Sequence, residues 1–365
     1  MMKNYINFSR FLVLLLIFSS CSDDDNYIPT IEVPVQVSPV NLNLDELPYQ
    51  TLSEYNFFDG NMANLNPVYG VLPYKIISGL FIDYAQAKTF VWMPEDSNAT
   101  YINDYTVLDF PTGSVLITTH YFENVLPDLN SKMVETRLLI KMENEWELFN
   151  YVWNENQTEA SFTTDGSFVP VDWLDNNETR SVNYRIPSYS ECFTCHNKYD
   201  VVFPIGPKPQ NLNHDLSFSD GVQNQLSKWT EFGYLNEGLP SDIVSAVDWS
   251  DASQPLELRA RSYLDINCSH CHSDEGYCDY RSMRFAFSET DDLSNMGVCV
   301  EPDTQIDNSI PYIVAPGYPE RSVLFFRISS TLEQNRMPLL GRTLQHEEGV
   351  RLIEEWINSL VVTCE

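Results

Sequence analysis

Hydrophobic and polar positions follow two different periods along the chain. From residue 47 to residue 189, short runs rich in β-branched and aromatic residues are separated by turn signals such as Asp165-Gly166. Runs of this length and composition are typical of strands. The clearest are 112–122, 135–142 and 146–153. Several short strands at this spacing predict an antiparallel β-sandwich-like domain over 47–189.

The second half of the chain changes to a helical period. Segments 222–232 and 255–264 each place their apolar residues on one side of a helix. Segment 347–360 carries a third such pattern and lies close to the C-terminus. The sequence therefore predicts an α+β multidomain protein, in which the N-terminal antiparallel β-sandwich-like domain precedes a mainly α-helical domain.

Two pentads in the chain share the pattern C-x-x-C-H: C-F-T-C-H at 192–196 and C-S-H-C-H at 268–272. They identify the predicted helical domain as a cytochrome c domain. This pattern marks covalent attachment of a c-type haem, in which both cysteines bind the porphyrin and the histidine ligates the iron. Two covalently bound haem c groups are therefore expected. The predicted attachment residues are Cys192, Cys195, Cys268 and Cys271, and the predicted iron ligands are His196 and His272.

A methionine beside a proline commonly completes the coordination of such an iron, and Met337 in R-M-P-L-L-G-R offers one after the second pentad. Core packing is the ordinary alternative for a methionine. The order of helix, pentad, Met-Pro loop and terminal helix predicts a class I cytochrome c-like domain over 255–365, with Met337 as distal ligand. A zinc ribbon fits less well, because the gap between the two cysteine pairs is long.

The first pentad lies in a predicted haem-binding segment, 190–254, that offers no evident distal ligand. No methionine lies between the two pentads. Three solutions remain open from the sequence. The iron is ligated by His214, by Met93 in F-V-W-M-P, or is left open on that side.

The first 20 residues have the features of a signal peptide. Lys3 and Arg10 precede the apolar run 11–18, and this run is too short to span a bilayer. Cys21 resembles the lipidated cysteine of bacterial lipoproteins, and the S-D-D-D that follows resembles the surface-export signal of Bacteroidota lipoproteins. These features predict lipidation of Cys21, an acidic tether over 21–46, and an outer-membrane lipoprotein at the cell surface, with the periplasmic face as the alternative.

The charge of the chain narrows the choice of partners. It has 52 acidic and 21 basic residues and a formal net charge of −31. Nucleic acid and anionic membrane surfaces repel such a chain, so neither is expected as a partner, and membrane contact is expected through the lipid anchor alone. Solubility is the ordinary explanation of this acidity, and docking to a basic redox partner protein is the alternative.

Three further cysteines remain outside the pentads and the lipidation site. In an exported protein, two of the three are expected to pair. The pair Cys299–Cys364 would join the loop after the second pentad to the terminal helix, and Cys278–Cys299 is the competing pair.

Several longer strings point in the same direction as the pentads. They include F-V-W-M-P (90–94), E-T-R-L-L-I-K (135–141), R-A-R-S-Y-L-D-I-N-C-S-H-C-H (259–272) and M-P-L-L-G-R (337–342). Together they resemble a family of bacterial di-haem c-type cytochromes, over roughly residues 47–364. The resemblance implies two covalent haems and a role in electron transfer or another redox step, and it implies no particular substrate.

The leading hypothesis is therefore a di-haem c-type cytochrome lipoprotein that carries electrons in the cell envelope, with no catalytic residue assigned. A first iron left open on one side would instead fit an enzyme of the di-haem peroxidase or oxidase type. A surface binding lipoprotein with accessory haem, whose β-rich domain grips carbohydrate or protein, is the third hypothesis.

Overall fold

The computed structural model describes residues 36–364. From Ser38 onward, the described chain forms one compact unit. The predicted signal peptide, the lipidation site Cys21 and most of the tether lie outside the described residues and stay predictions. The predicted boundaries at 189 and 254 fall within the compact unit and also stay predictions. No described helix is long and apolar enough to cross a bilayer.

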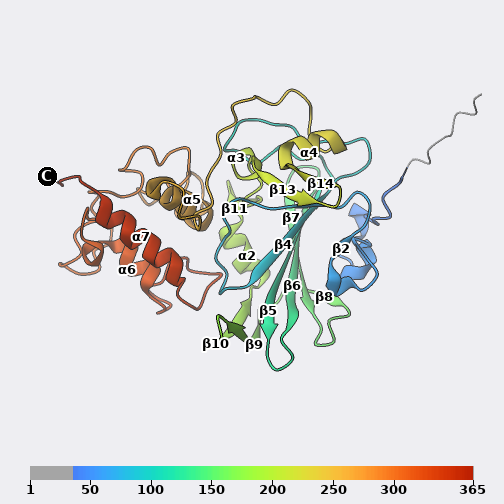
Figure 1. The fold of residues 1–365 in the computed structure, drawn as a ribbon, viewed down its shortest axis with the longest axis horizontal. Helices are drawn as coiled ribbons and strands as arrows, with labels where there is room; N and C mark the ends of the chain where they lie inside the picture. The colour runs from blue at the N-terminus through green and yellow to red at the C-terminus, as the bar shows by residue number, and fades with distance from the viewer. Residues whose placement is uncertain (1–35, 365) are drawn as a thin grey trace, which may run out of the picture. The chain divides into compact units, whose positions relative to one another are not determined.

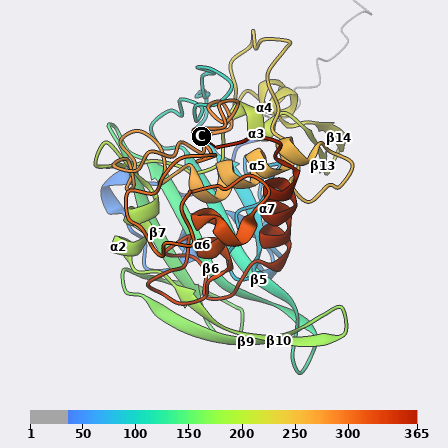
Figure 2. The same ribbon diagram turned by 90° about the vertical axis from the view of Figure 1, so that its left-hand side faces the viewer.

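An eight-stranded antiparallel sheet is the largest element of the fold (Figures 1 and 2). Its main path runs β10-β9-β5-β6-β7-β8, and β4 pairs with both β3 and β5. The strands are β3 (Leu72–Tyr74), β4 (Gln86–Trp92), β5 (Val115–Val125), β6 (Asn130–Lys141), β7 (Trp146–Trp153), β8 (Ala160–Thr163), β9 (Ser167–Asp175) and β10 (Glu178–Ile186). The longest two, β5 and β6, pair with each other, and their register shifts between His120 and Tyr121.

Side chains of the sheet alternate between its two faces. One face packs against the N-terminal segment, where Leu52 and Tyr55 join Ile117, Leu138 and Tyr151 in an apolar core. The hydroxyl groups of Tyr55 and Tyr151 lie 2.7 Å apart within it, so their burial leaves neither group without a hydrogen-bond partner. The opposite face is partly polar, and the site described below lies on that side.

Short hairpins and helices surround the sheet. The small sheets pair β1 (Phe58–Asp59) with β2 (Asn66–Pro67), β11 (Asn197–Lys198) with β12 (Val201–Val202), and β13 (Asp215–Phe218) with β14 (Gly221–Asn224). The helices are α2 (Tyr189–Cys195), α3 (Pro209–Leu212), α4 (Gln225–Phe232), α5 (Leu256–Cys268), α6 (Val323–Ser329) and α7 (Glu347–Ser359). Short 3-10 helices are η1 (Leu44–Glu46), η2 (Leu52–Tyr55), η3 (Met62–Asn64) and η4 (Pro319–Arg321). Helices α5, α6 and α7 share one apolar core (Figure 2).

The predicted fold class is wrong. The protein is mainly β, and no mainly α-helical cytochrome c domain follows the sheet. After residue 255 the only α-helices in the described chain are α5, α6 and α7, with 13, 7 and 13 residues. The long segment between α5 and α6 is polar and has no helical period. It folds as turns, in which backbone groups and short side chains pair locally, as Ser294 N does with Asp292 Oδ1 at 2.9 Å.

The helical periods themselves mark real helices, with shifted boundaries. The segment predicted at 347–360 is α7, and Ile353 and Ile357 on it are fully buried. The segment predicted at 222–232 begins as a strand, and its helix α4 starts only at Gln225, where the side chain of Asn224 accepts hydrogen bonds from the first turn. An asparagine N-cap overrides the apolar periodicity here because it satisfies helical N–H groups that would otherwise be unpaired.

The disulfide of the described chain joins Cys299 to Cys364, which is one of the two predicted pairings. Cys278 is free and buried. The bond closes a loop across a sequence separation of 65 residues and ties the coil after the second pentad to the segment that follows α7.

We expect Cys364→Ser to lower the free energy of unfolding by about 2–4 kcal/mol, because the unfolded chain regains the freedom of the closed loop. Urea unfolding measures this loss. The matched controls are Cys299→Ser and the double variant. All three should be equally destabilised, and a double variant that loses clearly more than either single variant would contradict the pairing.

Candidate functional site

The first pentad forms the last turn of α2 and the residue that follows it. The helix starts at a capping box, in which the carboxylate of Glu191 accepts a hydrogen bond from Ser188 N at 2.9 Å. Such a cap stabilises a helix too short to form by itself. Cys192 is buried within the helix, and His196 is its C-cap residue, so the pentad is held in a compact turn.

The ring of His196 is oriented by the backbone. Its Nδ1 lies 2.9 Å from the carbonyl oxygen of Phe203, and within the described chain Nε2 makes no hydrogen bond. A histidine that ligates a metal through one nitrogen usually donates its other N–H in this way. Burial lowers the pKa of His196 to about 4, so the imidazole is neutral at pH 7, as a metal ligand must be.

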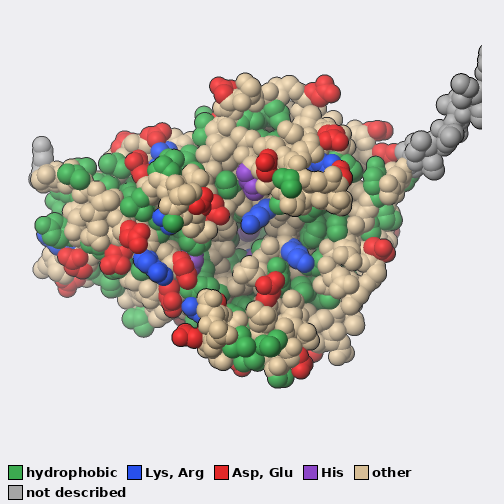
Figure 3. Space-filling view, viewed as in Figure 1, with side chains coloured by type: hydrophobic (Ala, Val, Ile, Leu, Met, Phe, Trp, Pro, Cys, Tyr) green, Lys and Arg blue, Asp and Glu red, His purple; other side chains and the backbone are tan. Residues whose placement is uncertain are grey.

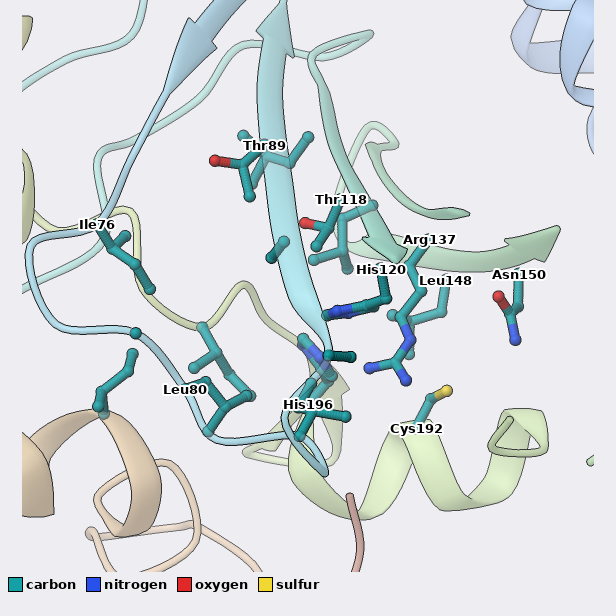
Figure 4. A pocket seen from close by; sticks show the side chains of 18 of the residues that line it. Ile76, Leu80, Thr89, Thr118, His120, Arg137, Leu148, Asn150, Cys192 and His196 are labelled. Atoms are coloured by element: carbon teal, nitrogen blue, oxygen red, sulfur yellow. The ribbon is translucent and has the colours of Figure 1, made fainter. Parts of the chain in front are cut away.

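A cavity of about 590 Å³ lies between α2 and the partly polar face of the sheet (Figure 4). Its volume falls in the range of about 300–1,000 Å³ that ligand pockets occupy. Cys192 and His196 line it from the helix. The sheet contributes alternate residues of its central strands, which include Thr118, His120, Arg137, Leu139, Leu148 and Asn150.

A buried ion pair lies in the wall of this first cavity. Glu135 is fully buried, and its Oε1 accepts hydrogen bonds from Arg137 Nη2 at 2.5 Å and from the Tyr184 hydroxyl at 2.6 Å. Burial by itself would raise the pKa of Glu135, but the guanidinium of Arg137 outweighs it and holds the pKa below its usual value. Figure 4 shows the guanidinium of Arg137 above Cys192, and burial raises the pKa of this thiol to about 11.

The second pentad begins at the last residue of α5, Cys268. His272 N donates to the carbonyl oxygen of Cys268 at 2.9 Å, which keeps the pentad in one turn. The His272 ring packs edge-on against Phe285, with 5.4 Å between ring centroids, and burial lowers its pKa to about 4. The pentad has the same local form as the first one, a tight turn at a helix C-terminus.

A second cavity of about 140 Å³ adjoins this pentad. Cys268, Cys271 and His272 line it, and Met337 lies in the same wall. The structure therefore brings together the four residues that the sequence assigned to the second site. Met283 also lines the cavity, and sequence reasoning missed it because no proline neighbours it.

The two pentads contact each other. The ligand atoms of Cys195, His270 and Cys271 all lie within 4.8 Å of one another. A hydrogen bond with Cys271 lowers the pKa of Cys195 and is the largest cause of the raised pKa of Cys271. His270 belongs to the second pentad in the sequence, and the structure places it beside the first pentad as well. Three such groups can hold a soft metal ion, but haem attachment would consume both thiols.

The two residues proposed from sequence as distal ligands of the first iron do not line the first cavity. His214 Nε2 lies 2.8 Å from the carbonyl oxygen of Lys75, and its Nδ1 lies 3.1 Å from that of Asp215. Met93 is 2% exposed and packs in an apolar core. The ligand hypotheses for His214 and Met93 therefore find no support in this geometry.

Sequence reasoning missed the residues of the sheet that face the first cavity. The available signal was the alternation Thr118-x-His120 in a predicted strand, together with Arg137 in the next one. A charged residue in an otherwise apolar strand is uncommon in a core, because its burial is costly. Such a residue marks a candidate site.

Comparisons with family models, with curated proteins and with solved structures found no match. The resemblance to di-haem cytochromes thus rests on the motifs of the chain itself.

Both pentads present the residues for covalent attachment of a haem. At the first, Cys192 and His196 line the cavity, whereas Cys195 lines the second cavity, so attachment through both thiols requires Cys195 to turn toward the first. Three residues of the first cavity wall, His120, Arg137 and Asn150, carry four buried polar atoms without hydrogen-bond partners: His120 Nδ1, Arg137 Nε and both amide atoms of Asn150. Buried polar atoms without a partner are rare and mark a candidate ligand site. At the second pentad, the thiols of Cys268 and Cys271, the imidazole of His272 and the thioether of Met337 line one cavity. Arg281 and Arg327 line it too and would provide cations for the carboxylates of a haem.

We expect Arg137→Leu to destabilise the fold by about 3–5 kcal/mol at pH 7, because it leaves the carboxylate of Glu135 buried without its cation. Urea unfolding gives the value. The loss should shrink as the pH falls toward and below 4.5, the ordinary pKa of the group, because burial without the cation raises the pKa of Glu135 in the variant and its carboxyl group then binds a proton.

The matched control is Lys132→Leu on the same strand. Lys132 pairs at 3.3 Å with Glu155, whose side chain is 86% exposed. This variant should lose at most about 1 kcal/mol. Equal losses in the two variants would show that the buried pair has no special role.

Proposed function

We propose that the protein is a di-haem c-type cytochrome that carries electrons in the cell envelope. The observation that carries this proposal is that a cavity adjoins each pentad. Cys192 and His196 line the first cavity, and Cys268, Cys271 and His272 line the second. Cys195 of the first pentad also lines the second cavity, so the two sites adjoin.

The residues take their roles from the chemistry of attachment. Cys192 and Cys195 hold the first haem, and Cys268 and Cys271 hold the second. His196 and His272 ligate the irons, and Met337 completes the second site. A bound haem c supplies a one-electron iron couple whose potential the protein tunes through ligands and burial. The backbone carbonyl of Phe203 fixes the ring of His196, and Phe285 packs against that of His272.

The contact between the pentads supports electron transfer in preference to two independent sites. Cys195 and Cys271 belong to different pentads and their sulfur atoms lie within 4.8 Å of each other, so the two attachment points adjoin. Adjacent redox groups in one protein core are what a carrier with two centres requires.

The partner and the location remain part of the proposal. The net charge of −31 favours a basic redox partner protein over nucleic acid. Figure 3 shows acidic side chains spread over the visible face and not gathered in one patch, which also serves solubility. Lipidation of Cys21 would anchor the protein in the outer membrane, at the cell surface.

The first test is an intact mass together with a reduced-minus-oxidised spectrum of the protein matured with haem-attachment machinery. We expect two covalent haems. The variants Cys192→Ala/Cys195→Ala and Cys268→Ala/Cys271→Ala should each lose one haem and keep the other. A protein without covalent haem, or one that binds zinc at Cys195, His270 and Cys271 instead, would refute the proposal.

A second test concerns the distal side of the second site. We expect Met337→His to lower the midpoint potential of one haem by on the order of 0.1 V, because an imidazole stabilises oxidised iron more than a thioether does. Redox titration measures it. Met283→Leu, in the same cavity wall, is the control and should leave both potentials unchanged. The reverse pattern would assign the ligand to Met283.

A further inference from the structure

The first haem needs a second axial ligand if it is to be a plain electron carrier. We propose that His120 of β5 is this ligand, on the side opposite His196, and that Glu135 positions it. This inference rests on the proposed function, and it names the residue that neither the pentad nor its flanking sequence supplies. The argument starts from which groups reach the first cavity.

Few side chains that line the first cavity can ligate iron. No methionine lines it, and its histidines are His120, His196 and His346. His346 is already engaged at both ring nitrogens. Its Nδ1 lies 3.1 Å from the Tyr263 hydroxyl, its Nε2 lies 3.7 Å from the carboxylate of Glu348, and its ring stacks on Phe81 with 4.1 Å between centroids. With His196 assigned to the pentad, His120 is the remaining imidazole.

The sheet holds His120 in the right place. Residues 116, 118 and 120 of β5 point to the face that lines the cavity, since side chains of a strand alternate. The register shift between β5 and β6 falls directly after His120. Shifts of this kind often re-aim a side chain next to a functional site. In Figure 4, the rings of His120 and His196 lie on facing sides of the space between β5 and α2.

The hydrogen bonding of His120 is incomplete without a further partner. The residue is 5% exposed, and neither ring nitrogen makes a hydrogen bond within the described chain. Its Nδ1 is fully buried and unpartnered. Such a ring is costly to bury unless a ligand takes up a nitrogen. Iron coordination by Nε2 would meet this need.

Glu135 offers a hydrogen-bond acceptor to the other ring nitrogen of His120, Nδ1. It is the direct cross-strand partner of His120, and its Oε2 is also buried and unpartnered. Side chains opposite each other on paired strands are close enough to interact. A hydrogen bond from His120 Nδ1 to Glu135 Oε2 would give both unpartnered atoms a partner and leave Nε2 for the iron. Carboxylate–histidine–metal arrangements of this kind fix the ring and raise its basicity.

The assignment has a consequence for function. Two imidazoles give the first iron a full set of ligands, so it has no open position for peroxide. The first site then differs from the second, where a thioether raises the potential. The peroxidase-type hypothesis required an open first iron, and this geometry argues against it.

The experiment uses the full chain matured with both haems, and it reads the spin state by electron paramagnetic resonance and absorption spectroscopy. We expect both haems to be low-spin in the natural protein. His120→Ala should keep two covalent haems by mass and convert one of them to high-spin, and added imidazole should restore the low-spin signal. His346→Ala, which alters the same cavity, and His214→Ala should leave both haems low-spin.

A second pair of variants guards against misfolding. His120→Met retains a ligand and should keep both haems low-spin while raising the midpoint potential of one. The paired change Glu135→Gln/Arg137→Leu, which removes both charges of the buried pair together, should also keep both haems low-spin and raise the same potential, because it weakens the polarisation of the ring. A structural role alone would leave that potential where it is.

The outcomes separate this inference from the proposed function. Two covalent haems with an unchanged spin state in His120→Ala and an unchanged potential in His120→Met would overturn the ligand assignment and leave the cytochrome proposal standing. A high-spin haem already present in the natural protein would do the same. Absence of covalent haem at Cys192 and Cys195 would overturn both.

Discussion

A buried carboxylate on α5 fixes the arrangement on which both pentads depend. Asp265 is 3% exposed and lies one turn before Cys268. It pairs with Lys208 Nζ at 3.0 Å and accepts a hydrogen bond from Phe287 N at 3.0 Å. Lys208 belongs to the segment that follows the first pentad. One side chain therefore holds the helix of the second pentad against the chain that leaves the first.

A neighbouring contact extends this constraint to the sheet. The side-chain carbonyl of Asn267 accepts a hydrogen bond from Phe81 N at 3.0 Å, and the segment around Phe81 lines the first cavity. Residues 265–268 thus connect the first pentad, the cavity wall and the second pentad within four positions. A buried ion pair adds little net stability, but loss of one partner leaves an uncompensated charge, so such a pair favours one arrangement over its alternatives.

Local patterns predicted the elements of this protein better than its architecture. The strands over 112–153 and the helix α7 follow from periodicity, which acts over short distances, and cysteine number left the Cys299–Cys364 pair as one of two alternatives. The prediction of a mainly helical second half was wrong because a polar coil has no period, and because the cytochrome motif led to an expectation of helices that the chain does not form. The four residues of the second site could be named from sequence because the pentad supplies three of them and the Met-Pro pattern marks Met337. The wall of the first cavity was not predicted, because His120 and Arg137 come from strands that only tertiary pairing brings over Cys192.

The two pentads share three of their five residues, and their surroundings make them different. The first faces a sheet whose central strands carry a buried Glu–Arg pair and unpartnered polar atoms, within about 590 Å³. The second faces coil and helix, with methionines and arginines around about 140 Å³. A central strand that buries charge goes against its own propensity, and such conflicts persist where function requires them. In the proposed cytochrome, the pentad sets what can be attached, and the strand opposite it sets how that group behaves. The sheet would then be part of the redox site, and the polar residues of β5 and β6 would tune its properties.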